Sequence, residues 1–329
     1  LTKTFSISGG ADSAQFNIVS STGVLTFASA PNYEVPTDVN SDNVYEVTVR
    51  IVDDGSPVQN DTQALSVTVT NVNELPSFTK GGDQSVLAGT STAQSISGWA
   101  TALNDGDSTV TQALSFTITG NTNAGLFDTA PAISSDGTLT YTPATTMGEA
   151  TITVTMSDDT SIDGSALTTA SQSFKISVVS IYEQWASTNN VSPTLMTDDD
   201  DTDGVPNLLE FAFGTNPQSG SSGPPQLAYS GTFAGGGSIT GRGQPDVDFE
   251  SVTNGVDYRA LFVRRKDHAA AGLSYRVEFS TNMTTWQTTS MPPTVLADDG
   301  VYQVVSVPYM SFIQGRKVTF FRVQVTLTP

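Results

Sequence analysis

The sequence contains no cysteine, and only one histidine occurs among its 329 residues. Without cysteine there are no disulfide bonds, thiol nucleophiles, iron–sulfur clusters or cysteine-based zinc sites. Secreted eukaryotic proteins of this length usually carry disulfides, so an extracellular bacterial product fits this composition better. No apolar run approaches the roughly 18 residues that a bilayer-crossing helix needs, so we expect no membrane insertion.

Basic residues are also scarce in this chain. There are 13 lysines and arginines against 33 aspartates and glutamates, and the net charge is −20. A polyanion of this kind is repelled by nucleic acids and by anionic membranes, so we expect neither as a partner. Divalent cations, in contrast, neutralise clustered carboxylates and are natural stabilisers of such a chain.

Features of enzymes are scarce as well. The single histidine, His268, lies beside the basic residues 264–266 at an expected strand end, where a solvated turn explains it. No G-x-S-x-G motif is present, zinc ligands are lacking, and no pair of carboxylates stands out for glycoside hydrolysis. We therefore expect no enzymatic activity. The basic residues would suit an acidic partner or another copy of the chain, although ordinary strand-end charge explains them equally well.

The most specific motif is an acidic loop at 199–210. Carboxylates occur at loop positions 1, 3 and 5, glycine at 6, a residue offering its carbonyl at 7, an amide oxygen at 9 and glutamate at 12. These residues are Asp199, Asp201, Asp203, Gly204, Val205, Asn207 and Glu210. Calcium binds six to eight oxygens, and this is the spacing of a twelve-residue EF-hand loop. The motif predicts calcium binding; the alternative is a solvated acidic turn.

Alternating apolar residues and frequent turn residues predict a mostly β chain. In 45–51, apolar side chains recur at every second position, as in a strand with one buried face. Residues 1–77 and 78–180 predict two tandem β-sandwiches, and 218–329 predicts a third. Expected strands include 44–51, 65–69, 150–156, 273–280 and 317–327.

Two segments interrupt the β pattern. Residues 181–217 predict two short helices, at 182–186 and 207–213, on either side of the acidic loop, with Gly214 ending the second helix. Residues 218–244 are rich in Gly, Ser and Pro and predict a linker or an excursion between strands.

The first unit resembles a bacterial cadherin-like repeat over residues 1–78. Four segments carry the resemblance in the order found in that family. They are F-x-I…T-G-x-L at 16–25, N-Y-E at 32–34 in place of D-Y-E or D-R-E, I-x-D-x-G-x-P at 51–57 in place of A-x-D-x-G-x-P, and the linker N-V-N-E-L-P-S-F at 71–78. The opening of the family domain is missing before Leu1, so we expect a chain cut from a longer array.

The remaining parts show further resemblances. The second unit is more loosely similar to cadherin-like and immunoglobulin-like repeats, and 199–210 resembles the calcium loops of dockerin and thrombospondin type 3 repeats. Together these resemblances imply tandem Greek-key β-sandwiches with a short helical, EF-hand-like insert before a C-terminal β-sandwich.

The cadherin resemblance implies calcium at the junction between the first two units, where it would stiffen the connection. The implied ligands are Glu34, Asp53, Asn71, Asn73, Glu74, Asp105 and Asp107. Asn71 and Glu74 replace aspartates of the family motif, which implies fewer ions than in animal cadherins because ligand charge sets affinity. Turn formation is the alternative, since Asn and Asp favour turns. At Asp158, Asp159 and Asp163, where a further A-x-D motif would stand, we expect a solvated turn.

These features favour a calcium-binding extracellular or cell-surface protein with a structural or adhesive role, the C-terminal part of a larger bacterial polypeptide. Its expected partners are calcium and other copies of itself, surface proteins or glycans. Two alternatives are a self-assembling subunit of a filament or surface layer, and a non-catalytic stalk of a larger secreted enzyme.

Overall fold

The computed structural model describes residues 1–243, 245–252, 255–309 and 318–328. The described chain is mostly β, with several small sheets and two short α-helices, as the sequence predicts. It divides into two compact units. Unit 1 comprises Leu1–Gln84, Ser91–Ala144 and Glu149–Ser177, and unit 2 comprises Ser85–Thr90, Thr145–Gly148 and Val178–Pro329.

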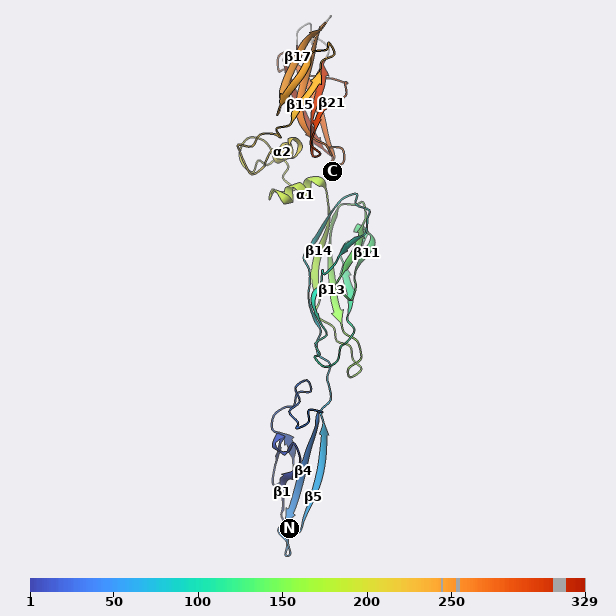
Figure 1. Cartoon of the computed structure of the whole chain (residues 1–329), viewed down its shortest axis with the longest axis vertical. Helices are drawn as coiled ribbons and strands as arrows, with labels where there is room; N and C mark the ends of the chain where they lie inside the picture. The colour runs from blue at the N-terminus through green and yellow to red at the C-terminus, as the bar shows by residue number, and fades with distance from the viewer. Residues whose placement is uncertain (244, 253–254, 310–317, 329) are drawn as a thin grey trace. The chain divides into compact units, whose positions relative to one another are not determined.

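The first sheet of unit 1 has the strand order β1-β4-β5 (Figure 1). Tyr45 and Val47 of β4 are buried while Glu46 between them is exposed, which confirms the expected two-residue period. Their side chains pack with Phe16 of a small hairpin, β2 and β3. The elements are β1 (Lys3–Gly9), a 3₁₀ turn (Ser13–Gln15), β2 (Phe16–Ile18), β3 (Leu25–Phe27), β4 (Val44–Asp53) and β5 (Asn60–Thr68).

The second sandwich pairs a four-stranded sheet, β10-β13-β14-β7, with a three-stranded sheet, β11-β12-β8. Alternate residues of β13, from Ala150 to Met156, are fully buried and form the centre of its core. The elements are β6 (Ser77–Thr79), β7 (Gln84–Leu87), β8 (Gln94–Ile96), β9 (Thr101–Asn104), β10 (Ser115–Asn121), a 3₁₀ turn (Ala124–Leu126), β11 (Phe127–Ile133), β12 (Leu139–Pro143), β13 (Gly148–Ser157) and β14 (Gln172–Val179).

The two helices of unit 2 are α1 (Ile181–Thr188) and α2 (Asn207–Phe213). Ser180 and Glu183 form a capping box that starts α1, because each side chain accepts a hydrogen bond from the backbone amide of the other residue. Gly214 ends α2 in the left-handed conformation, with φ of 75°, as expected for a C-cap glycine. None of the helices among the described residues is long and apolar enough to cross a membrane.

The C-terminal sandwich stacks the sheet β17-β18-β22-β21 against β20-β19-β23, with the hairpin β15–β16 packed nearby. Aromatic side chains such as Phe262 and Phe279 fill its core. The strands are β15 (Ala228–Thr232), β16 (Ser238–Arg242), β17 (Asp246–Val252), β18 (Gly255–Arg265), β19 (Leu273–Ser280), β20 (Gln287–Thr288), β21 (Thr294–Asp298), β22 (Tyr302–Tyr309) and β23 (Phe320–Leu327).

Several expected boundaries differ from the structure. Within the described part of the segment 218–244 the chain forms the hairpin β15–β16, whose Tyr229 and Ile239 bury their side chains in the C-terminal core. Strand β5 begins at Asn60 and not at 65, since backbone pairing with β4 does not require apolar side chains. The expected strand at 317–327 begins at Phe320, and residue 317 lies outside the described residues.

Candidate metal sites

Three carboxylates from separate parts of unit 1 meet in one place. Glu34 comes from the loop between β3 and β4, Glu74 from the segment that joins β5 to β6, and Asp107 from the turn that follows β9. One oxygen of each lies within 4.8 Å of the others. These residues are far apart in the sequence, so this cluster, called the junction site below, exists only because the chain folds.

Hydrogen bonds to neighbouring residues hold the carboxylate of Asp107 in place at the junction site. Its Oδ2 accepts a hydrogen bond from Nδ2 of Asn71 at 2.7 Å, and its Oδ1 accepts from the amides of Thr109 and Val110 at 2.6 and 2.7 Å. Burial alone would raise the pKa of Asp107, but these hydrogen bonds to the charged form outweigh it and hold the pKa well below its ordinary value. The carboxylate is therefore ionised and fixed in position.

The pKa of Glu74 reflects the repulsion among the three carboxylates. Its pKa is raised, first by burial and then by the negative charges of Glu34 and Asp107. Oε1 of Glu34, Oε2 of Glu74 and Oδ1 of Asn71 are buried and have no hydrogen-bond partner. Buried oxygens without partners are costly in a folded protein. A hard cation with oxygen ligands fits this donor set, and calcium is such a cation.

Asn73 lies next to the junction site and connects it to Asp158. Its Nδ2 donates to Oδ2 of Asp158 at 3.2 Å and to the carbonyl of Ser165 at 2.7 Å, while its Oδ1 is buried without a partner. Asp158 is only 4% exposed and also accepts from the amide of Leu167. A solvated turn is therefore wrong for Asp158. The one sequence signal was its place in a further A-x-D position.

Two predicted ligands do not join the cluster. Asp53 lies opposite Lys3 of β1 in the strand register, at the C-terminal end of β4. Val44, at the other end of β4, follows the loop that carries Glu34. A ten-residue strand spans roughly 30 Å, so Asp53 lies far from the junction site. Its carboxylate accepts from the amides of Gln59 and Gly55 instead, and these bonds lower its pKa. Asp105 accepts from the amide of Gln112 at 2.8 Å and is not among the three clustered carboxylates.

The acidic loop of unit 2 gathers its first three predicted ligands. Oxygens of Asp199, Asp201 and Asp203 lie within 4.8 Å of one another. Backbone amides of the loop donate hydrogen bonds to these carboxylates. Gly204 N donates to Asp199 Oδ2 at 2.7 Å, and Val205 N donates to Asp203 Oδ1 at 2.8 Å. Gly204 has φ of 93°, a conformation that glycine adopts without strain. Val205 stands at the position whose carbonyl binds calcium in EF-hand loops.

The other two predicted ligands of this loop lie in the first turn of α2 and are buried. Asn207 and Glu210 are both 0% exposed, and Oδ1 of Asn207, Oε2 of Glu210 and Oδ2 of Asp201 have no hydrogen-bond partner. Burial, followed by the charges of Asp201 and Asp203, raises the pKa of Glu210 to about 7. A buried glutamate beside several aspartates suits a divalent cation, whose charge would offset both effects.

Helix α2, which carries Glu210, is tightly attached to the C-terminal sandwich. The hydroxyl of Tyr275 in β19 donates to the carbonyl of Ala212 at 2.6 Å, and the guanidinium of Arg265 lies 4.4 Å from the ring centre of Phe211. Phe211 and Ala212 are fully buried in a cluster with Leu273 of β19. Helix α2, which supplies the last two predicted ligands of the loop, is therefore part of the core of unit 2.

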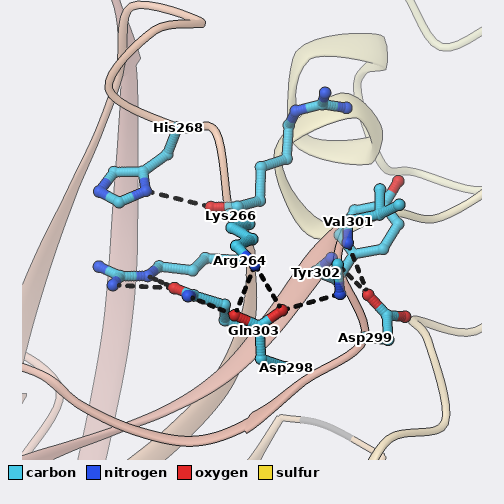
Figure 2. Close-up of polar contacts among 10 residues, drawn as sticks. Arg264, Lys266, His268, Asp298, Asp299, Val301, Tyr302 and Gln303 are labelled. Carbon is cyan, nitrogen blue, oxygen red and sulfur yellow. Dashed lines mark hydrogen bonds and ion pairs between the residues drawn. The ribbon is translucent and has the colours of Figure 1, made fainter.

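The basic residues around His268 make most of their contacts with neighbouring side chains of the same sandwich. Figure 2 shows Arg264 donating to Oε1 of Gln303 and Lys266 paired with Asp298, whose Oδ2 lies 3.1 Å from Nζ. Nδ1 of His268 lies 3.1 Å from the carbonyl of Arg265. Arg265 itself pairs with Asp267 at 2.8 Å. Ordinary strand-end charge, one of the two readings of these residues, accounts for these contacts.

Comparison with protein families and with curated proteins found no match. Among solved structures, a crystal structure of human protocadherin-24 EC1-2 is 16% identical over 54% of this chain and 82% of that chain, with a TM-score of 0.38. A crystal structure of mouse cadherin-23 EC22-24 is 12% identical over 94% of this chain and 77% of that chain, with a TM-score of 0.36. At these identities and TM-scores, the likeness does not indicate a function for this chain.

Proposed function

We propose that this chain is an extracellular calcium-binding protein with a structural or adhesive role, and that calcium stiffens it. The observation that carries the proposal is the state of the predicted ligands. At both sites, buried carboxylate and amide oxygens lack hydrogen-bond partners and lie beside other negative charges. Folding places these negative charges close together and away from water, which is unfavourable, and a bound divalent cation would offset their repulsion.

At the junction site, calcium would join three segments that lie far apart in the sequence. Glu34 belongs to the first sandwich, Glu74 to the connecting segment, and Asp107 to the second sandwich. The unpartnered amide oxygens of Asn71 and Asn73 would be available as further ligands. An ion shared by these groups would restrict motion at the connection, which is the mechanical role proposed here.

At the acidic loop, calcium would act on one unit and not on a junction. Glu210 closes the loop from α2, and α2 packs into the C-terminal core. Calcium at this loop is therefore expected to stabilise unit 2 against unfolding. At a free calcium concentration one hundred times the dissociation constant, each independent site would add about 2.7 kcal/mol.

Self-assembly is a second candidate, favoured by one observation. Strand β5 is the last strand of its sheet in the described chain, it is nine residues long, and most of its side chains are exposed. Exposed edge strands can pair with other chains. Sedimentation at increasing protein concentration tests this candidate, which requires a growing assembly; a monomer at all concentrations would contradict it.

Calcium titration of the full chain, by calorimetry and by thermal melting, tests the proposed function. We expect heat of binding and a rise in melting temperature that a chelator reverses. Glu74→Gln should remove the binding at the junction site, whereas Asp128→Asn, which removes one exposed charge from β11, should not. The absence of both binding heat and a melting shift in the native sequence would refute the proposal.

A further inference from the structure

A loop in the first sandwich repeats the pattern of the acidic loop at 199–204. Residues 38–43 read Asp-Val-Asn-Ser-Asp-Asn, with Asp38, Asn40 and Asp42 at positions 1, 3 and 5. Positions 4 and 6 have positive φ in both loops: 59° and 61° at Ser41 and Asn43, and 62° and 93° at the corresponding residues of the acidic loop. The two loops therefore share a backbone course as well as a residue pattern.

Two hydrogen bonds occur at the same positions inside both loops. The amide at position 5 donates to the carboxylate at position 1, as Asp42 N does to Asp38 Oδ2 at 2.8 Å. The amide at position 7 donates to the carboxylate at position 5, as Val44 N does to Asp42 Oδ1 at 2.8 Å. In the acidic loop, the same two bonds join Asp203 to Asp199 and Val205 to Asp203, at 3.1 and 2.8 Å.

The observation that points to a ligand is the state of the Asp38 side chain. Asp38 is only 5% exposed, and its Oδ1 is buried without a hydrogen-bond partner. Because its Oδ2 is held by the loop amide of Asp42, the carboxylate is directed into the loop. A buried carboxylate oxygen without a partner is costly unless a cation or another donor satisfies it. Oδ1 of Asn43, in the same loop, is also buried without a partner.

The loop is held in place by side chains that do not belong to it. Asp12, only 4% exposed, accepts from Val39 N at 2.7 Å and from Glu46 N at 2.8 Å, so it fixes the chain on both sides of the loop. The hydroxyl of Tyr45 accepts from the amide of Thr37 at 3.0 Å. The position of Asp38 is thus set by the sandwich and would need little rearrangement to bind an ion.

We propose that residues 38–44 form a third divalent-cation site, with calcium as the ion that its oxygens suit. Its ligands are Asp38, Asn40, Asp42 and the carbonyl of Val44, with water completing the coordination. The carbonyl of Asn43 accepts a hydrogen bond from Val69 N of the neighbouring chain segment. Because successive residues of a strand turn their backbone groups to opposite sides, the carbonyl of Val44 faces away from that segment. It lies on the same side as Val44 N, which donates to Asp42. Two carboxylates supply a charge that matches a divalent cation.

This site binds more weakly than the acidic loop. Position 12 of the repeated pattern is Val49, so the closing bidentate glutamate is missing, and two carboxylates take the place of four. Fewer charged ligands lower calcium affinity, and sites of this kind in extracellular modules have dissociation constants of about 10⁻⁴–10⁻³ M. The ion would be bound at millimolar calcium and lost at micromolar calcium.

Equilibrium dialysis of the full chain against 5 μM and about 5 mM calcium chloride, a range chosen to span these affinities, counts the bound ions. Asp42→Asn, at an exposed position, and Asp38→Asn, an isosteric change, should each bind one ion fewer than the native sequence at the higher concentration. Asp61→Asn, which removes one exposed charge from β5 in the same sandwich, should bind the native number. Equal numbers in all four proteins would overturn the third site.

The inference extends the proposed calcium function to a new site, and the same experiment separates the two. Glu74→Gln and Glu210→Gln report on the junction site and on the acidic loop. If each of these loses one ion while Asp42→Asn loses none, the third site is refuted and the proposed function stands. If Asp42→Asn alone loses an ion, the third site stands and the other two fail. A native chain that binds no calcium refutes both.

Discussion

Replacing Glu210 by glutamine is expected to stabilise the calcium-free protein while removing its stabilisation by calcium at the acidic loop. Glu210 is fully buried beside Asp201 and Asp203, and its Oε2 has no hydrogen-bond partner. Glutamine has nearly the same shape and carries no charge. It therefore removes the cost of burying the carboxylate, and with it the closing calcium ligand.

The size of the effect follows from the pKa of Glu210, which burial and the neighbouring aspartates raise from an ordinary value of 4.5 to about 7. Between these values the folded calcium-free protein binds more protons than the unfolded chain. The stability linked to this proton is fully present below pH 4.5 and is lost as the pH rises through 7. A shift of this size corresponds to about 3 kcal/mol, as an upper bound.

Thermal or denaturant unfolding of both proteins in chelator, from pH 4.5 to 8.5, measures this difference. Glu210→Gln should match the native protein at pH 4.5 and exceed it above pH 7, and it should lack the stabilisation that calcium gives the native protein at the acidic loop. Asp200→Asn is the matched control, because it removes a charge from position 2 of the same loop, which is not a ligand position. Equal pH dependence in both proteins, or full calcium stabilisation of Glu210→Gln, would refute the reasoning.

Two further changes test how the acidic loop is supported. Gly214→Ala should destabilise unit 2 by more than about 1 kcal/mol in denaturant unfolding, because φ is 75° there and a Cβ would lie 2.5 Å from the ring of Tyr302; an unchanged midpoint would contradict this. Tyr275→Phe should cost about 1–3 kcal/mol by leaving the carbonyl of Ala212 without its donor, and should weaken calcium binding at the acidic loop in calorimetry. Loss of stability with unchanged calcium affinity would show that α2 does not need this anchor.

Local features of this chain could be predicted from the sequence. Helix α2 begins and ends where the acidic loop and Gly214 predict, and the aspartates at positions 1, 3 and 5 of that loop gather as their spacing requires. The alternation of buried and exposed side chains along β4 and β13 could also be predicted from the sequence. All of these depend on contacts within about a dozen residues, where the geometry of the backbone leaves few alternatives.

The composition of the junction site could not be read correctly in this way. Asp53 and Asp158 stand at similar points of similar motifs, yet Asp53 lies at the far end of β4, while Asp158 is buried beside Asn73. Spacing along a strand does not tell which end of a sandwich faces the neighbouring unit. The loop at 38–44 does not match the EF-hand pattern in sequence, because position 6 is an asparagine and the closing position 12 is a valine.

The sequence by itself determined the mostly β architecture, the helical insert and the oxygen-rich character of the candidate sites, because these follow from short-range periodicity and residue chemistry. Only the tertiary structure decided which distant oxygens share a site and which of them are buried without partners. Those properties depend on strand pairing between segments up to a hundred residues apart, and burial of a polar atom is a property of its neighbours and not of its own residue type.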